Sequence, residues 1–430
     1  LTCGTSACPS DIDPCNSWNP TDIFVRTYEK KREFTKSFAF RMKPDSELKL
    51  TKNTGFHERT SKLTRNFVDA RGYWLPNDYT KHGVINEYTA CREKAVLIDL
   101  SSLRKFEILG PDAEELMDYT LTRNVKKLSV GQIVYSSMCY ENGSMFDDGT
   151  LLKMSDHGFR WVCGDEYAGE WLKEQAKKKK FNVLVKNSTD QINNISLQGP
   201  NSRKILEKFI FTPPTQPSIS ELQWFRFTIC RVKELSGIPL MVSRTGYTGE
   251  LGYEIWCHPS DAPAVWDVLM EAGKDEGIIP AGFGALDLLR IEAGLILFGN
   301  EFDGQVDPFE AGVGFTVPLK TKTADFIGKE ALIKRKENPQ KKLVGLELVG
   351  KEKANHGDCV HIGRSQVGVV TSGCLSPTLN KNIALCRIDV GHSEIGMNVE
   401  VGKIDGHQKR IPAKVVGFPH YDPQKTRVKS

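Results

Sequence analysis

The sequence predicts an α+β fold that ends in a small antiparallel β-barrel. Strand and helix patterns alternate from Phe56 onward, whereas residues 343–420 contain mostly strand and turn patterns. The chain has 430 residues, a length that indicates two or three domains. Hydrophobic residues make up 39% and charged residues 26% of the chain, as in ordinary globular proteins.

The N-terminal region differs from the rest in composition. Residues 1–25 are irregular and rich in cysteine, and the first residue is Leu1 and not Met. We therefore expect the truncated end of another domain there, in a chain that starts inside a larger protein. Residues 26–55 are charged and polar, which predicts a linker or a solvated arm.

Residues 56–335 predict two α+β halves, and residues 336–425 a barrel. Gly143 supplies the turn of a hairpin in the first half, because its position requires a positive φ. The strands expected in the halves are Phe106–Leu109, Val134–Cys139, Leu151–Met154, Trp161–Cys163, Ile195–Gln198, Phe227–Val232, Leu240–Ser243 and Tyr253–Cys257. Helices are expected after Pro111, at Tyr167–Lys180, at Pro200–Phe209, from about Ser260 and at Gly284–Ala293. The barrel strands are Val344–Val349, Val367–Thr371, Ile383–Ile388 and Ala413–Val416.

The charge pattern argues against a nucleic-acid or membrane partner. The net charge is +4, and the densest basic run, Lys177–Lys180, ends an expected helix, where positive charge suits the helix dipole. No stretch approaches the roughly 18 apolar residues of a membrane span, and no secretory signal is present. Seven cysteines stand alone in apolar surroundings, which favours a reducing, cytoplasmic compartment. They are Cys91, Cys139, Cys163, Cys230, Cys257, Cys374 and Cys386.

The usual nucleotide and hydrolase motifs are missing, and one group of polar residues stands out instead. No phosphate-binding G-x-x-x-x-G-K-[ST], G-x-S-x-G or H-E-x-x-H motif occurs. Asp147 and Asp148 are adjacent carboxylates, which repel each other unless they find a partner or solvent. They form either a turn pair that caps the hairpin or a carboxylate that holds or accepts a proton near a developing cation.

The segment Arg244–Glu254 contains three glycines within seven residues. It is either a glycine-rich hairpin or a loop whose backbone approaches a flat ligand closely. Glu254 on the following strand needs a hydrogen-bond donor if it is buried, and a guanidine-like pterin edge would supply two. Arg290 lies in an apolar helix, where an ion pair with Glu292 is disfavoured because residues two apart do not face each other. A carboxylate elsewhere is its expected partner.

Several motifs in the same order along the chain resemble the glycine-cleavage T-protein family. The resemblance covers about residues 56–420. Its motifs are Tyr88-x3-Arg92-x6-Asp99 with Ser101, Gly143–Asp148, Gln198-Gly-Pro200, Arg244–Glu254, Gly284–Gly294, Phe326–Leu332, Lys342–Gly345, Thr371–Leu379 and Ile383–Leu385. It implies a three-part clover-leaf fold around a folate channel, and tetrahydrofolate as the cofactor.

The resemblance also implies roles for individual residues. Asp148 matches the family's catalytic carboxylate, Glu254 the acid that binds the pterin, and Arg290 the residue that reaches the folate tail. Tyr135 matches a tyrosine that packs in the folate site. We expect two further cofactor-binding side chains beside these, Asp147 and Tyr247. The family often has Tyr four residues after the catalytic Asp, where this chain has Leu152.

The N-terminal segment indicates which members of this family the chain resembles most. The family includes folate modules fused to other domains, as in sarcosine and dimethylglycine dehydrogenases and trimethylamine N-oxide demethylase. The sequence around Cys8 looks like the end of the cysteine metal-site domain that precedes the folate module in the last of these, and Cys8 matches its last zinc ligand. Zinc needs several ligands, so a zinc site is expected only together with an upstream metal domain.

Three functions follow as expectations. The first is capture of formaldehyde or an iminium, released from a methylated amine such as trimethylamine N-oxide, as 5,10-methylene-tetrahydrofolate. The second is an aminomethyltransferase that takes its aminomethyl group from a lipoyl carrier protein. The third is a folate-binding protein without catalysis, which the presence of Asp148, Glu254 and Arg290 disfavours. The small-molecule donor and the upstream domain are the expected partners, and the oligomeric state is left open.

Overall fold

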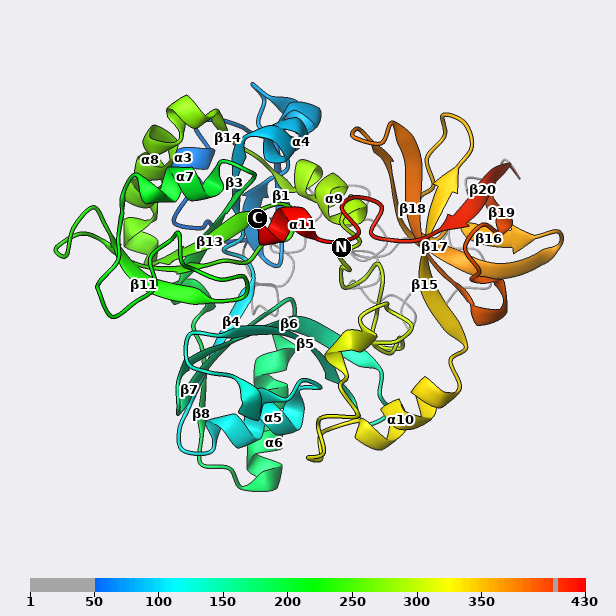
Figure 1. Cartoon of the computed structure of the whole chain (residues 1–430), viewed down its shortest axis with the longest axis horizontal. Coiled ribbons are helices and arrows are strands. Elements are labelled where there is room, and N and C mark those ends of the chain that lie inside the picture. The colour runs from blue at the N-terminus through cyan, green and yellow to red at the C-terminus, as the bar shows by residue number, and fades with distance from the viewer. Residues whose placement is uncertain (1–50, 405–408) are drawn as a thin grey trace, which may run out of the picture. The chain divides into compact units, whose positions relative to one another are not determined.

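The computed structural model describes residues 51–404 and 409–430. Cys8, the segment 1–25 and most of the segment 26–55 lie outside the described residues. A compact unit begins at Asn53 and runs to Ser430. Within this unit the chain forms three lobes, and each lobe is built around one sheet (Figure 1).

The first lobe contains a seven-stranded sheet with the order β10-β11-β12-β13-β9-β3-β14. All neighbouring strands are antiparallel except β14 and β3. The strands are β3 (Ala95–Asp99), β9 (Asn193–Gln198), β10 (Ile210–Phe211), β11 (Phe227–Val232), β12 (Pro239–Ser243), β13 (Gly252–Cys257) and β14 (Ile278–Pro280). The helices of this lobe are α3 (His57–Thr60), α4 (Gly83–Glu93), α7 (Ser202–Glu207), α8 (Ala262–Ala272) and α9 (Phe283–Glu292). The hairpin of β1 (Phe67–Ala70) and β2 (Tyr73–Pro76) precedes α4.

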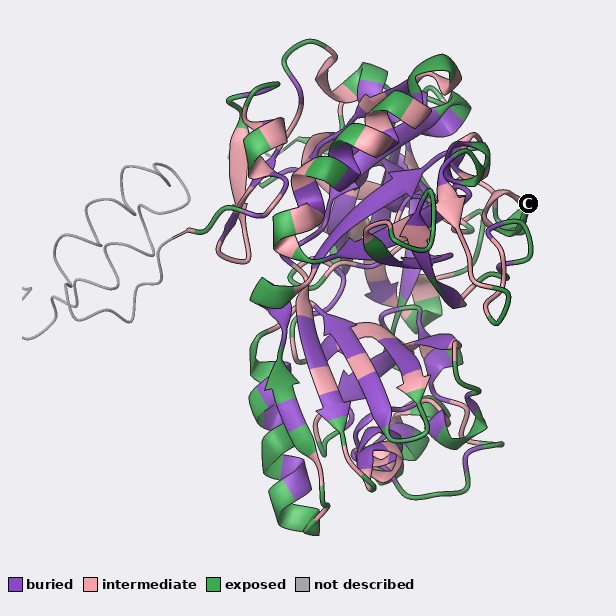
Figure 2. Ribbon diagram, turned by 90° about the vertical axis from the view of Figure 1, so that its left-hand side faces the viewer, coloured by how far each residue is buried: buried purple, intermediate pink, exposed green. Residues whose placement is uncertain are grey.

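The apolar spacing of α8 explains how the first lobe is packed. Val265, Trp266 and Leu269 recur at helical spacing, so they lie on one face of the helix. This face is buried in the same core as Leu197 of β9 and Ile255 of β13. In Figure 2 the strands are mostly buried, and the outer faces of the helices are exposed.

The second lobe contains an antiparallel five-stranded sheet with the order β5-β6-β7-β4-β8. Its strands are β4 (Arg104–Leu109), β5 (Ile133–Cys139), β6 (Met145–Ser155), β7 (Gly158–Cys163) and β8 (Leu184–Asn187), and its helices are α5 (Ala113–Thr120) and α6 (Tyr167–Lys179). Phe106, Trp161 and Trp171 belong to its core. The chain leaves the first sheet after β3, builds this lobe and returns at β9, which pairs with both β3 and β13. The two α+β parts are therefore interleaved along the sequence.

The third lobe is a closed barrel with the order β15-β18-β17-β16-β19-β20. Pairing of β15 with both β18 and β20 closes it. Its strands are β15 (Lys341–Leu348), β16 (Cys359–Ile362), β17 (Ser365–Ser376), β18 (Lys381–Asp389), β19 (Asn398–Gly402) and β20 (Arg410–Val416). Helix α10 (Lys329–Glu337) precedes the barrel, and α11 (Thr426–Lys429) follows it. The predicted C-terminal barrel is confirmed.

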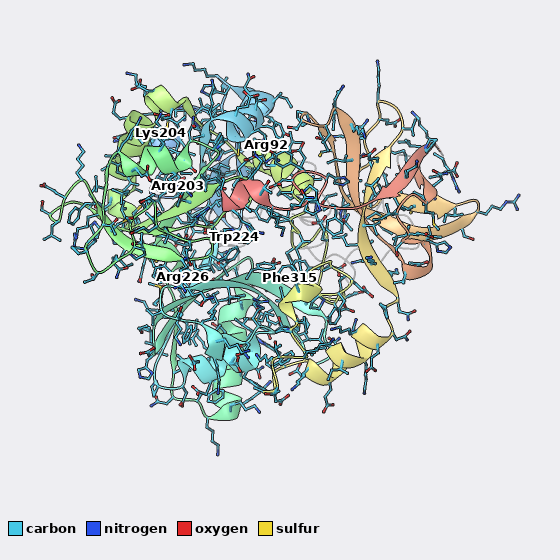
Figure 3. The ribbon with its side chains drawn as sticks, in the orientation of Figure 1. Arg92, Arg203, Lys204, Trp224, Arg226 and Phe315 are labelled. Carbon is cyan, nitrogen blue, oxygen red and sulfur yellow. The ribbon has the colours of Figure 1, made fainter. Side chains whose placement is uncertain are left out.

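A buried ion-pair cluster connects the first lobe to the barrel. Arg92 of α4 pairs with Glu292 of α9 at 2.6 Å and with Glu250 at 3.0 Å. Glu292 also accepts hydrogen bonds from Tyr88 of α4 and from Ser376 of the barrel strand β17. Figure 3 shows Arg92 beside these helices. The expectation that Arg290 does not pair with Glu292 agrees with this arrangement, because Glu292 is occupied by Arg92.

The sequence predictions differ from the structure in strand length and in the elements that they miss. The hairpin strand expected at Leu151–Met154 begins at Met145, so Asp147 and Asp148 lie within a strand and not in a turn. The reason is that the pairing with β5 continues up to the turn, where Gly143 has the expected positive φ of 82°. Several short or amphipathic elements were not predicted from the sequence, and they are β1, β2, β3, β8, β10, β14, β16, β19, α3, α4, α10 and α11.

The sequence also predicted unpaired cysteines in apolar surroundings and no membrane-spanning helix. All seven of the single cysteines are free and buried in the structure. In the part of the chain that the structure describes, every helix is too short or too polar to cross a membrane.

Candidate active site

Strand β6 directs Asp147 and Asp148 to opposite faces of the second sheet, because successive side chains of a strand alternate. Asp148 stands opposite Ser137 of β5, and Tyr135 is two residues further along the same face. The Tyr135 hydroxyl donates a hydrogen bond of 2.5 Å to Oδ2 of Asp148. Burial raises the pKa of Asp148 to about 6, although the Tyr135 hydrogen bond and the charge of Arg71 act in the opposite direction.

Asp147 lies on the other face of the sheet, where its carboxylate accepts hydrogen bonds from backbone N–H groups. Its side chain is fully buried, and it accepts hydrogen bonds from the backbone N–H groups of Asp148 at 2.9 Å, Gly164 at 3.3 Å and Asp165 at 3.2 Å. Burial, followed by the adjacent Asp148 charge, raises its pKa to about 7. The structure therefore places Asp147 where it fixes the end of β7 against β6.

Tyr247 lies close to the Asp148 pair. Its hydroxyl donates to the carbonyl of Ile296. Burial is the first cause that raises the pKa of Tyr247, and the charge of Asp148 adds to it. Burial and then Asp148, with a smaller contribution from Tyr247, also raise the pKa of Tyr135. The structure thus brings Tyr135, Asp148 and Tyr247 together from two lobes.

Glu254 lies on β13 between two small neutral side chains. Ser243 of β12 and Ser196 of β9 are its partners in register. The Thr245 hydroxyl donates to Oε2 of Glu254 at 2.5 Å, and Oε1 accepts no hydrogen bond from the residues that the structure describes. Burial raises the pKa of Glu254, whereas the Thr245 hydrogen bond and the charge of Lys105 lower it. One carboxylate oxygen is therefore left for a ligand.

Two glycines of the Arg244–Glu254 loop, Gly246 and Gly252, pack against the side chain of Gln198. A Cβ atom at Gly246 or at Gly252 would stand 2.1 Å from the side-chain oxygen of Gln198. That oxygen accepts a hydrogen bond from Thr248 at 2.8 Å, and the Gln198 amide donates to the carbonyl of Thr245 at 3.2 Å. The close approach that these two glycines permit is to Gln198 of the protein itself, and an approach of the loop backbone to a flat ligand stays a prediction.

Arg290 is buried and paired within the protein. Its guanidinium binds Glu301 at 3.0 Å, Asp287 at 2.8 Å and the Ser372 hydroxyl at 2.8 Å. Only 1% of the Arg290 side chain is exposed. The expected carboxylate partner is therefore present in the chain, and a contact of Arg290 with a folate tail stays a prediction.

Two residues near the Tyr135–Asp148 pair were not predicted from the sequence. Arg71, at the tip of the β1–β2 hairpin, has a φ of 56° and donates from Nε to the carbonyl of Gly164 at 3.0 Å. A turn at Arg71-Gly72 between two short strand patterns was the signal for it. Phe315 is 61% exposed, its ring centroid lies 6.1 Å from that of Tyr135, and Figure 3 shows it at the inner side of the second lobe. Nothing in the local sequence distinguishes Phe315 from a core residue.

Metal binding was predicted only for Cys8 with an upstream domain. Among residues 51–404 and 409–430, no group of three or more His, Cys, Asp or Glu side chains could hold a metal ion. Cys8 is outside these ranges, so its predicted role is not tested.

Comparison with known proteins agrees with the fold and the motifs. The family model of the GCVT N-terminal domain matches residues 56–321, and that of the glycine cleavage T-protein C-terminal barrel domain matches residues 341–422. A crystal structure of the glycine cleavage system aminomethyltransferase T from Bartonella henselae has a TM-score of 0.76 at 26% identity. It covers 86% of this chain and 98% of that chain.

Two curated relatives show how far the similarity extends. The trimethylamine-oxide aldolase of Ruegeria pomeroyi is 57% identical over 430 residues, which are 100% of this chain but 54% of that protein. The chain thus spans about half the length of this relative. An aminomethyltransferase of Symbiobacterium thermophilum is 39% identical over 376 residues, which are 86% of this chain and 97% of that protein. With both family models matched in order and the three-lobed fold in place, the chain belongs to the glycine-cleavage T-protein family of aminomethyltransferase-like enzymes.

Proposed function

We propose that the chain binds tetrahydrofolate and uses it to capture a one-carbon unit as 5,10-methylene-tetrahydrofolate. The observation that carries this proposal is a pair of half-buried carboxylates in different lobes, each with a neighbouring hydroxyl donor. Asp148 accepts from Tyr135, and Glu254 accepts from Thr245. A pterin edge presents adjacent N–H donors, and Oε1 of Glu254 is an acceptor without a donor among the described residues. The free carboxylate oxygen of Glu254 therefore fits the N–H donors of the cofactor.

In this proposal some residues bind the cofactor, and Asp148 stabilises the charge that develops during the reaction. Tetrahydrofolate, when bound, supplies two nitrogens that accept the one-carbon unit. Glu254 holds the pterin edge, and Tyr135 and Phe315 provide apolar ring faces beside the reacting region. Asp148, held by Tyr135, stabilises positive charge that develops next to it, and a preorganised charge of this kind is a large contribution to catalysis.

The proposed one-carbon donor is formaldehyde or an iminium from a methylated amine such as trimethylamine N-oxide. Similarity to the Ruegeria pomeroyi trimethylamine-oxide aldolase extends over all 430 residues, whereas similarity to the aminomethyltransferase covers 376. In this proposal an upstream metal domain, with Cys8 as one zinc ligand, generates the donor. The alternatives are aminomethyl transfer from a lipoyl carrier protein and folate binding without catalysis.

A comparison of donors tests the proposal. The rate of 5,10-methylene-tetrahydrofolate formation is measured with formaldehyde, and separately with an aminomethyl-loaded lipoyl carrier protein, each above the background without protein. We expect acceleration with formaldehyde and none with the carrier. The opposite pattern favours the aminomethyltransferase alternative, and folate binding with no acceleration by either donor favours the non-catalytic one.

The pKa of Asp148 predicts the acid limb of the pH profile. Asp148 must be ionised to stabilise positive charge, so kcat/KM should fall as the pH drops through about 6. Tyr135→Phe removes a hydrogen bond that lowers the pKa of Asp148, so the limb should move to higher pH by about one unit. Profiles of kcat/KM between pH 5 and 9 for both proteins, with that pH range chosen to bracket the limb, check this. A limb that stays in place in Tyr135→Phe contradicts the assignment of the limb to Asp148.

A further inference from the structure

A chain of hydrogen bonds between side chains ends on the carboxylate of Glu254. The indole Nε1 of Trp256 donates to Oγ of Ser243 at 3.1 Å. Oγ of Ser243 lies 2.9 Å from Oγ1 of Thr245, which in turn lies 2.5 Å from Oε2 of Glu254. Trp256, Ser243 and Thr245 are all buried. The three side chains therefore form a connected path that solvent does not interrupt.

The chemistry of the end groups fixes the direction of every bond in this path. An indole N–H can only donate, and an ionised carboxylate can only accept. Thr245 must then donate its proton to Glu254, so it accepts from Ser243, and Ser243 accepts from Trp256. The longer contact of 3.4 Å from Ser243 to the Glu254 carbonyl is the weaker alternative for the serine proton. All donors in the path point toward the charged oxygen.

We infer that Thr245 and Ser243 are positioning residues, which hold Oε2 of Glu254 so that Oε1 stays available for the paired N–H donors of a bound pterin. This inference rests on the proposed function and deepens it, because it names what orients the pterin-binding acid. Hydrogen bonds in a buried chain strengthen one another, since each polarises the next. Loss of Thr245 would leave Glu254 without the side-chain hydroxyl that fixes it.

Among residues 51–404 and 409–430, Lys105 is the charged group that acts on the pKa of Glu254. Lys105 on β4 is fully buried and donates from Nζ to the carbonyls of Ser101 at 2.9 Å and Leu103 at 2.8 Å. Asp99 on β3 raises the pKa of Lys105, and Arg160 on β7 lies with its guanidinium 6.0 Å from the Trp256 ring centroid. The residues in register on β9 and β12 are serines and carry no charge. Lys105 is therefore the titratable neighbour to consider, and burial lowers its pKa to about 7.

Thr245→Val tests the inference, because it keeps the shape of the side chain and removes the hydroxyl. The dissociation constant of tetrahydrofolate is measured by calorimetry across a series of acidic to neutral pH values. Without the Thr245 donor, the pKa of Glu254 rises, so binding should weaken at a higher pH than in the unaltered protein. A displacement of about one pH unit corresponds to roughly tenfold weaker binding on the acid side. Thr245→Ser should restore the original profile.

Two further variants separate the possible failures. Glu254→Ala should weaken folate binding and remove the part of the pH dependence that Thr245→Val displaces, and unchanged binding in that variant would overturn the proposed folate site itself. If Glu254→Ala weakens binding but Thr245→Val leaves both affinity and pH profile unchanged, the positioning inference alone is overturned. Should Thr245→Val not fold, Ser243→Ala is measured instead, with a smaller displacement in the same direction expected. No displacement there overturns the inference equally.

Discussion

Asp148→Asn is expected to slow one-carbon transfer by about 10²- to 10⁴-fold while tetrahydrofolate affinity stays within a few-fold of its original value. Asparagine keeps the size of the side chain and an oxygen that can accept from Tyr135, so the local packing is retained. What is lost is the negative charge beside the reacting region. Single-turnover formation of 5,10-methylene-tetrahydrofolate and a separate binding titration check the two parts of the prediction.

A matched control lies on the same strand hairpin. Asp156 stands exposed at the turn between β6 and β7, so Asp156→Asn removes an equal charge from the same strand pair away from Tyr135. We expect its turnover to equal that of the unaltered chain. If Asp148→Asn turns over at the same rate as Asp156→Asn, Asp148 is not the catalytic carboxylate.

Arg92→Met is expected to lower the free energy of unfolding by about 3–5 kcal/mol, the usual cost of removing one partner from a buried ion pair. The Arg92 side chain is 6% exposed and binds both Glu250 and Glu292. Its removal leaves the buried Glu292 without a cation where the first lobe meets the barrel, whereas Glu250 keeps its ion pair with Arg427 at 2.7 Å. Urea unfolding followed by circular dichroism measures the change.

A surface ion pair supplies the control for this measurement. Lys62 pairs with Glu58 at 3.4 Å, and the Lys62 side chain is 66% exposed. Lys62→Met should change the free energy of unfolding by less than about 1 kcal/mol, because exposed pairs contribute little. Equal changes in Arg92→Met and Lys62→Met would contradict the structural role of the buried cluster.

The sequence identified the fold class because its information is local and periodic. Short strand patterns separated by turn residues between Val344 and Val416 predicted the barrel, and the helical spacing of Val265, Trp266 and Leu269 predicted α8. Strand β3 (Ala95–Asp99) is buried at all five positions and shows no alternation, so periodicity could not reveal it. The return of the chain to the first sheet at β9 depends on long-range pairing, which no local pattern encodes.

The site residues, too, could be predicted where a local motif marks them, but not where they depend on long-range contacts. Asp148 and Glu254 stood out as polar residues inside ordered motifs, and the structure places a hydroxyl donor on each. One partner of Arg290 could not be read from the sequence, because Ser372 lies in the barrel, 82 residues away along the chain. Gln198, which fills the space beside Gly246 and Gly252, hydrogen-bonds Thr245 and Thr248 from 47 and 50 residues away along the chain. Long-range contacts decide these details, and only the folded chain contains them.

The central claim is that Glu254 anchors a bound tetrahydrofolate. Isothermal titration of tetrahydrofolate into the full chain and into Glu254→Ala, both checked for folding by circular dichroism, tests it most directly. We predict one binding site on the unaltered chain and at least about tenfold weaker binding in Glu254→Ala, because a charged hydrogen-bonding partner is lost. Absence of binding to the unaltered chain, or equal affinity for both proteins, would contradict the claim.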